Sequence, residues 1–240
     1  AQGERSLAVG ENADAQSDLS TAIGNEAIAN GTDALAIGDT SVATGPSTTA
    51  VGGESVANGP GTTALGWQAN AAAPFSNALG HQSTANGEQA IAIGEDSTAN
   101  GIGSIAIGGN NDADGDGVPD QGQGATTDGA DAIAMGAGAS ATGPSTTSIG
   151  GEAVTNGPGS TAIGWQSAAT AERAQAFGHL ATAQGVRSLA IGENADAQSD
   201  LSTAIGNEAI ANGTDALAIG DTASATGPST TSVGGESVTN

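Results

Sequence analysis

The sequence predicts an all-β fold, a parallel solenoid built from short coils of equal length. The main observation is that a large apolar residue followed by glycine recurs at every fourteenth position, with a single double step between Gly108 and Gly136. A fixed period of this kind indicates one small structural unit stacked on copies of itself. The recurring glycines are Gly10, Gly24, Gly38, Gly52, Gly66, Gly80, Gly94, Gly108, Gly136, Gly150, Gly164, Gly178, Gly192, Gly206, Gly220 and Gly234.

Composition is the second observation. The chain of 240 residues contains 40 Gly, two Trp, two Phe, one Met and no Tyr. So few large side chains cannot build the thick core of an ordinary globule, since burial stabilises by about 25 cal/mol per Å² of apolar surface. A thin solenoid whose coils bury small faces against one another fits this composition better, and oligomerisation would add further apolar burial.

The first predicted strand lies at the end of each coil. We number the positions of the fourteen-residue coil from its start and place the recurring glycine at position 14. Position 13 is always large and apolar, and position 12 is Ala except at Ser148 and Ser232. Position 11 is often Leu or Ile, as at Leu35, or Thr, as at Thr21. Such alternation over this short run predicts a strand.

The second predicted strand lies near the start of the coil. Position 3 is Ala or Ser, as at Ala27 and Ser41, and position 5 is Ala or Thr. A second glycine, such as Gly31, often follows and suits a tight turn. Two strands and two turns use up the whole period, so no crossover helix fits and like residues of neighbouring coils should form ladders.

The orientation of the first strand is open in the sequence. We expect the aliphatic residues at position 13 to fill the narrow interior of the coil. The small residues at positions 10 and 12 would then face outward, on a flat surface suited to contact with another copy of the chain. The opposite assignment fits the alternation almost equally well.

The charge of the chain excludes several classes of partner. Three basic residues, Arg5, Arg173 and Arg187, stand against 26 acidic residues and give a formal net charge of −23. Nucleic acids and anionic lipids are bound through Lys and Arg, so neither is an expected partner. The chain contains no Cys and therefore has no disulfide or thiol chemistry.

The sequence does not predict an enzyme or a required cofactor. Its two histidines, His81 and His179, have no partners at the spacing of a zinc site, and nothing in the sequence buries or orients them as a catalytic triad requires. The glycine-rich turns do not precede helices, so they are not phosphate-binding loops.

Longer duplications overlie the short repeat. Residues 1–58 recur as 183–240 with six differences, and residues 43–68 recur as 141–166. Both offsets are whole numbers of coils, thirteen and seven respectively. Repetition of the same surface in register is typical of an extended protein that binds at many points, and less so of an enzyme with a single catalytic pocket.

Residues 109–122 (GNNDADGDGVPDQG) form an acidic insert of one period, because residues 123–136 already make a complete coil. Within the insert, Asp112, Asp114, Asp116, the backbone carbonyl of Val118, and Asp120 follow the first nine positions of a calcium loop, D-x-D-x-D-G-x-x-D. The glutamate expected at the twelfth position is replaced by glutamine, at residue 123, which weakens the site. The pattern predicts a candidate structural Ca²⁺ site; a solvated acidic loop without an ion is the alternative.

Four aromatic residues are candidates for an adhesive surface. Trp67 and Trp165 occupy position 1 of their coils, and His81 and His179 occupy position 1 one coil later. Other coils place polar residues there, such as Glu11, so this position should be exposed. Aromatic side chains are favoured anchors at interfaces. The alternative is that each Trp lies flat over an adjacent chain of an oligomer.

The repeated runs SLAVGENA (6–13), STAIGNEA (20–27) and AIAIGEDS (90–97) resemble the heads of trimeric autotransporter adhesins of the YadA-like type. The resemblance covers the chain outside residues 109–122 and implies a left-handed parallel β-roll assembled as a homotrimer. It makes residues 1–240 one YadA-like head. Residues 45–55 and 64–69 are most similar to the heads of very large, sticky fibres of the Acinetobacter type.

The resemblance also implies a function. Heads of this family attach bacteria to extracellular-matrix proteins, host cells, other bacteria or abiotic surfaces. The chain is then expected to be a fragment of the exported passenger region of a type V secretion system, displayed at the cell surface. Its connection to the outer membrane would be a coiled-coil stalk and a β-barrel anchor outside this sequence.

Two other functions are kept as alternatives. A monomeric ice-binding solenoid would use threonine ladders on a flat face, for which Thr48, Thr49, Thr62 and Thr63 are candidates. A purely structural spacer within a surface fibre would need no binding site. RTX-type calcium rolls and hexapeptide acyltransferases are disfavoured because their repeats have other periods and motifs.

Overall fold

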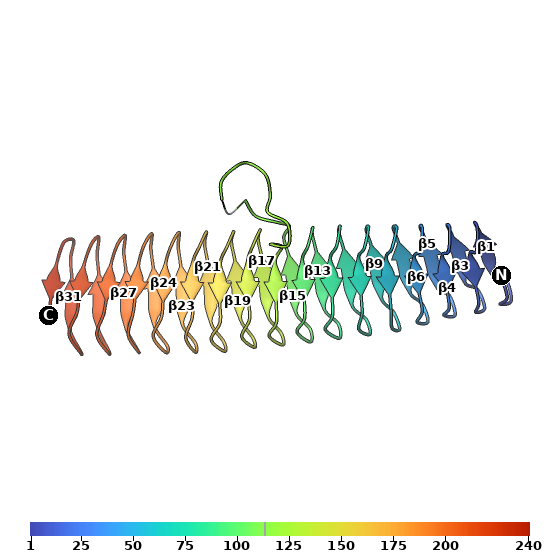
Figure 1. The fold of residues 1–240 in the computed structure, drawn as a ribbon. Coiled ribbons are helices and arrows are strands. Elements are labelled where there is room, and N and C mark those ends of the chain that lie inside the picture. The colour runs from blue at the N-terminus through green and yellow to red at the C-terminus, as the bar shows by residue number, and fades with distance from the viewer. Residues whose placement is uncertain (113) are drawn as a thin grey trace. The chain divides into compact units, whose positions relative to one another are not determined.

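The computed structural model describes residues 1–112 and 114–240 and divides the chain into two compact units, residues 1–127 (unit 1) and 128–240 (unit 2). Within each unit, short strands are stacked one coil after another, as Figure 1 shows. No helix in the described ranges is long and apolar enough to cross a membrane.

Unit 1 contains two parallel sheets, one on each side of the coil. The odd-numbered sheet consists of β1 (Leu7–Val9), β3 (Thr21–Ile23), β5 (Leu35–Ile37), β7 (Thr49–Val51), β9 (Thr63–Leu65), β11 (Asn77–Leu79), β13 (Ile91–Ile93) and β15 (Ile105–Ile107). The even-numbered sheet consists of β2 (Asp14–Ala15), β4 (Ile28–Ala29), β6 (Val42–Ala43), β8 (Val56–Ala57), β10 (Asn70–Ala71), β12 (Thr84–Ala85), β14 (Thr98–Ala99) and β16 (Thr126–Thr127).

Unit 2 repeats this architecture. Its odd-numbered sheet consists of β17 (Ile133–Met135), β19 (Thr147–Ile149), β21 (Thr161–Ile163), β23 (Gln175–Phe177), β25 (Leu189–Ile191), β27 (Thr203–Ile205), β29 (Leu217–Ile219) and β31 (Thr231–Val233). Its even-numbered sheet consists of β18 (Ser140–Ala141), β20 (Val154–Thr155), β22 (Ala168–Ala169), β24 (Thr182–Ala183), β26 (Asp196–Ala197), β28 (Ile210–Ala211), β30 (Ser224–Ala225) and β32 (Val238–Thr239).

The pairing register follows the sequence period. Strands β3 and β5 pair in parallel and place Ala22 opposite Ala36 and Ile23 opposite Ile37. The predicted all-β parallel solenoid of fourteen-residue coils is therefore confirmed in both units. Around the acidic insert, β14 pairs directly with β16 and places Thr98 opposite Thr126, two periods further along the sequence. In Figure 1 the described residues of the insert stand out from the strands as a green loop.

The interior of each coil contains small side chains. Away from the two end coils, the residues at position 12, such as Ala22 and Ala204, are buried, and so are those at position 10, such as Ser20 and Thr48. On the opposite strand, positions 3 and 5 are buried too, as at Ala29. The alternation of a strand therefore places the small residues inside and their neighbours outside.

This arrangement corrects the expected orientation of the first strand. The aliphatic residues at position 13 do not fill the coil: Ile191 is 37% exposed, and Val9 and Ile163 are also exposed. The residues at positions 10 and 12 do not form an outer surface. The physical reason is width, because the two strands of so short a coil lie too close together for Leu or Ile to fit between them.

Hydroxyl groups inside the coil close its corners. The Oγ1 atom of Thr48 donates a hydrogen bond to the carbonyl of Gly45, at 2.8 Å, and Thr62 does the same to Gly59, at 3.0 Å. Both side chains are therefore buried and satisfied. This removes Thr48 and Thr62 from the threonine face that an ice-binding solenoid would need, and leaves Thr49 and Thr63 facing outward.

The recurring glycine marks a close approach of neighbouring coils. Gly206 has φ of +137°, and a Cβ atom built on it would lie 2.2 Å from the carbonyl oxygen of Gly220. Only glycine adopts this backbone conformation readily and leaves room for the next coil. Glycine is thus required at position 14 for two reasons: the positive φ and the absence of space for a side chain.

Replacement of this glycine should unfold the stack locally. We expect Gly206→Ala to lower stability by about 2–4 kcal/mol, because the substitution combines an unfavourable φ with a backbone clash. The matched control is Gly235→Ala, where the nearest atom to a new Cβ, the carbonyl oxygen of Asp221, is 3.9 Å away. Urea unfolding followed by circular dichroism measures both, and equal midpoints for the two variants would contradict this account of the corner.

Candidate functional site

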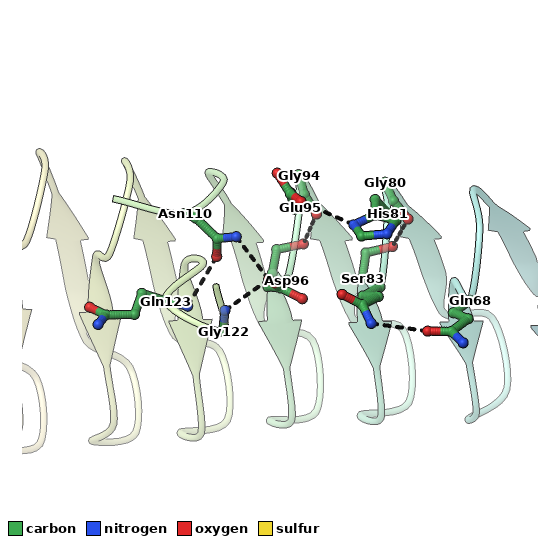
Figure 2. A network of polar contacts seen from close by, with 12 residues as sticks. Gln68, Gly80, His81, Ser83, Gly94, Glu95, Asp96, Asn110, Gly122 and Gln123 are labelled. Carbon is green, nitrogen blue, oxygen red and sulfur yellow. Dashed lines mark hydrogen bonds and ion pairs between the residues drawn. The ribbon is translucent and has the colours of Figure 1, made fainter. Parts of the chain in front are cut away.

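The first candidate site is a column of side chains in unit 1. Trp67 lies in the turn between β9 and β10, where Gly66 (φ +140°) and Gln68 (φ +54°) reverse the chain. Its indole ring stacks on the imidazole of His81, with ring centroids 4.9 Å apart and planes at 15°. The Nδ1 atom of His81 lies 3.0 Å from a carboxylate oxygen of Glu95, one coil further on. Figure 2 shows this contact between His81 and Glu95.

Unit 2 contains the same column. Trp165 stacks on His179 with centroids again 4.9 Å apart at 15°, and His179 Nδ1 lies 3.4 Å from the Oε1 atom of Glu193. We call these two sets, Trp67–His81–Glu95 and Trp165–His179–Glu193, the Trp–His–Glu columns. The indoles are 44% and 47% exposed, respectively. Each column therefore presents a half-exposed aromatic ring whose orientation is set by its own chain.

The preceding coil contributes a glycine to the other side of each indole. Position 1 of that coil is Gly53 in unit 1, and a Cβ atom built there would lie 3.2 Å from Trp67 Cδ1. Beside this glycine, Glu54 accepts a hydrogen bond from Gln68 Nε2 at 2.7 Å. In unit 2, Gly151 takes the place of Gly53, at 3.1 Å from Trp165 Cδ1, and Glu152 accepts from Gln166 Nε2 at 2.6 Å.

The four aromatic residues are predictable from the sequence, but their acidic partners were not among the predicted site residues. The signal was present, because Trp67, His81 and Glu95 all occupy position 1 of successive coils and are spaced by exactly one period. In a parallel stack such residues are neighbours. Which of the many side chains at position 1 would interact depended on the geometry of the turn.

The acidic insert is attached beside the unit 1 column. The Oδ2 atom of Asp96 accepts hydrogen bonds from Asn110 Nδ2 and from the backbone N–H of Gly122, both at 2.8 Å. Asn110 Oδ1 in turn accepts from the N–H of Gln123 at 3.0 Å. Figure 2 shows Asp96 between these two ends of the insert. One carboxylate, adjacent in sequence to Glu95 of the column, therefore holds both ends of the loop.

Three of the predicted calcium ligands lie together. Asp112, Asp114 and Asp116 are exposed, and one carboxylate oxygen from each lies within 4.8 Å of the others. This is the span that two Ca²⁺–oxygen bonds of about 2.4 Å would bridge. Among the described residues, Asp120 is not in that group; its backbone N–H donates to the carbonyl of Asn111 at 2.7 Å. Val118 is exposed, and its N–H donates to Asp116 Oδ1. Calcium binding here stays a prediction.

The outer face of the odd-numbered sheet is a second candidate surface. In both units it carries the aliphatic residues of positions 11 and 13, which the coil interior cannot accommodate. In unit 2 this stripe includes Ile133, Met135, Ile149, Ile163, Phe177, Leu189, Ile191, Ile205, Leu217, Ile219 and Val233. Position 11 of the odd-numbered sheet also includes polar residues such as Thr147 and Gln175, but its position 13 is apolar in every coil, whereas the outer face of the even-numbered sheet mixes residues such as Ile210 and Asp196. The apolar stripe therefore singles out one face of the coil.

Comparison with known proteins gives one family. The family model described as YadA head domain repeat (2 copies) matches residues 1–27, 15–41, 29–55, 43–69, 57–83, 76–97, 85–111, 99–117, 121–139, 141–167, 169–195, 183–209, 197–223 and 211–237. A solved structure, the collagen-binding domain of the Yersinia adhesin YadA, is similar with 20% identity over 99% of this chain and 84% of that chain, at a TM-score of 0.21. No curated protein sequence matches the chain.

Calcium titration tests the loop. We expect the chain to bind Ca²⁺ with a dissociation constant on the order of 10⁻⁴–10⁻³ M, since the bidentate glutamate is absent. The double variant Asp112→Asn, Asp114→Asn should abolish this binding in isothermal titration calorimetry. The control, Asp33→Asn with Asp215→Asn, makes the same change of charge outside the loop. An equal calcium signal from both variants would show diffuse attraction to an acidic chain and no loop site.

Proposed function

This chain belongs to the YadA head-repeat family, and we propose that it is the head of a bacterial surface adhesin that binds by many weak, repeated contacts. The observation that carries the proposal is the family match, which extends over nearly all of the chain from residue 1 to residue 237. The resemblance implies display at the cell surface as an exported passenger region. Collagen, other matrix proteins, host cells and abiotic surfaces are the proposed targets.

The surface chemistry supports this proposal. The exposed Trp–His–Glu columns occur once in each unit with nearly the same geometry. Two copies of one weak contact in a single chain raise the overall affinity, because the second contact forms at high effective concentration. A net charge of −23 per chain disfavours non-specific clumping of the heads and favours cationic or neutral targets.

We further propose that the functional form is a homotrimer, joined through the aliphatic stripe of the odd-numbered sheet. The stripe continues along every coil of each unit, whereas monomeric proteins seldom expose large continuous apolar patches. Burial of this stripe against copies of itself supplies the apolar contact that the small-residue interior of the coil lacks.

Matched substitutions test the trimer interface. We expect Ile191→Asp, on the aliphatic stripe, to shift the chain from trimer to monomer, because a carboxylate buried at an apolar interface is strongly unfavourable. Ile210→Asp is the control, since Ile210 is equally exposed at 38% but lies on the outer face of the even-numbered sheet. Sedimentation velocity measures both. Dissociation by Ile210→Asp alone would place the interface on the other sheet.

Retention on surfaces tests adhesion itself. The trimer should be retained on at least one of collagen, fibronectin, laminin, plastic and glass, and the double variant Trp67→Ala, Trp165→Ala should lose most of this retention. Phe75→Ala is the control, because Phe75 is an exposed aromatic residue at another corner of the coil. If the unaltered trimer is retained on none of these surfaces, the chain is a spacer and the proposal is wrong.

A further inference from the structure

We propose that each Trp–His–Glu column is a docking site for a guanidinium group, an arginine side chain of a basic protein partner. This inference deepens the proposed function and relies on it only for the biological setting. It concerns the uncovered face of the indole, the face opposite the stacked histidine.

On the side of each indole opposite the histidine, the preceding coil contributes no side chain. His81 covers one face of Trp67, and the coil on the other side contributes Gly53, which has no side chain to cover the ring. The same holds for Trp165, between His179 and Gly151. Both rings are held by contacts within their own chain, so little conformational freedom remains to be lost when a ligand stacks on them.

The charge of the residues around each indole also matters. Glu54 and Glu152 directly follow Gly53 and Gly151 in sequence, and each accepts a hydrogen bond through its Oε2 atom from the glutamine that follows the tryptophan. No Lys or Arg occurs between Arg5 and Arg173, so the unit 1 column is in a stretch of chain without any cationic side chain. An aromatic face next to a carboxylate is attractive to a cation and unattractive to an anion.

The shape of the site favours a guanidinium over an ammonium group. A guanidinium is planar, stacks on an aromatic face and donates hydrogen bonds to a carboxylate at its edge. An ammonium group is compact and more strongly hydrated, so it gains less from stacking. The flat ring of Trp67, with Glu54 hydrogen-bonded to the adjacent Gln68, fits arginine better than lysine. A neutral sugar could also stack on Trp, but it would gain nothing from the charge.

The same arrangement of residues occurs around both tryptophans. The two columns are separated by seven periods of sequence, one of which is the acidic insert, and both retain the glycine, the glutamate and the glutamine around the indole. A partner with several arginine side chains could therefore contact more than one column, and weak single contacts would add up.

Indole fluorescence tests the inference directly, because the chain contains two Trp and no Tyr. The trimeric chain is titrated with hexa-arginine, hexa-lysine and the neutral oligosaccharide maltohexaose. We expect hexa-arginine to change the emission and to bind several-fold more tightly than hexa-lysine, while maltohexaose has no effect. The variant Trp165→Phe isolates the signal of the unit 1 column, and Trp67→Phe that of the unit 2 column.

A charge variant tests the role of the carboxylate. In the Trp165→Phe background, Glu54→Gln should weaken hexa-arginine binding about two- to five-fold, the range expected for an exposed ion pair. The matched control is Glu26→Gln, because Glu26 is also an exposed glutamate at position 2 of its coil, with a left-handed backbone like that of Glu54. Equal effects of the two variants would show general charge attraction and overturn the inference.

Other outcomes would also overturn it. A response to maltohexaose alone would assign the columns to glycans. Indoles protected from acrylamide quenching in the trimer but not in the monomeric Ile191→Asp variant would show that each Trp is covered by a neighbouring chain. The adhesion proposal is tested separately. If the trimer is retained on matrix surfaces but hexa-arginine does not change the indole fluorescence, adhesion stands and the docking site is wrong. If hexa-arginine binds but the trimer is not retained, the docking site stands and adhesion is wrong.

Discussion

The close approach of one coil to the next is the constraint on which the rest of this structure depends. At the recurring corner, a Cβ atom on Gly38 would lie 2.4 Å from the carbonyl oxygen of Gly52, so a side chain there has no space. Inside the coil, the buried side chains are Ala, Ser and Thr, as at Ala36 and Thr48. Serine and threonine remain satisfied in this interior where their hydroxyl groups donate to the carbonyls of the corner, as Thr48 does.

Because the interior of the coil is narrow, the large aliphatic, aromatic and acidic side chains lie on the surface. Large aliphatic side chains cannot enter the coil, so they form an outward stripe on one sheet, and this face is where an oligomer would gain apolar burial. The turns at position 1 are free of that constraint and hold the aromatic and acidic residues. A fold with no thick core has little room for a buried pocket, so the proposed binding sites lie on its surface.

Because the coils repeat in register, side chains on this surface interact with residues one period away in the sequence. Neighbouring side chains at position 1 lie one coil apart, so stacking and ion pairing form between residues one period apart in sequence, as for Trp67 with His81 and His81 with Glu95. The duplication of residues 43–68 as 141–166 copies the coils that carry the glycine, the glutamate and the tryptophan, and the geometry of the column is reproduced in unit 2. A binding site made of three or four successive coils can thus be multiplied without any redesign of the fold.

The sequence by itself determined the period, the two short strands of each coil, the corners and the exposed position of the tryptophans, because each of these follows from local spacing. It also delimited the loop of residues 109–122, since the coils on either side are complete without it. Only the tertiary structure decided which face of the first strand is inside. Alternation separates Ala204 from Ile205 onto opposite faces but assigns neither to the interior, and the distance between the two strands, which no local pattern encodes, made that choice. The tertiary structure also selected Glu95 and Glu193 as the partners of the histidines, because the turn geometry determines which neighbours in a ladder come into contact.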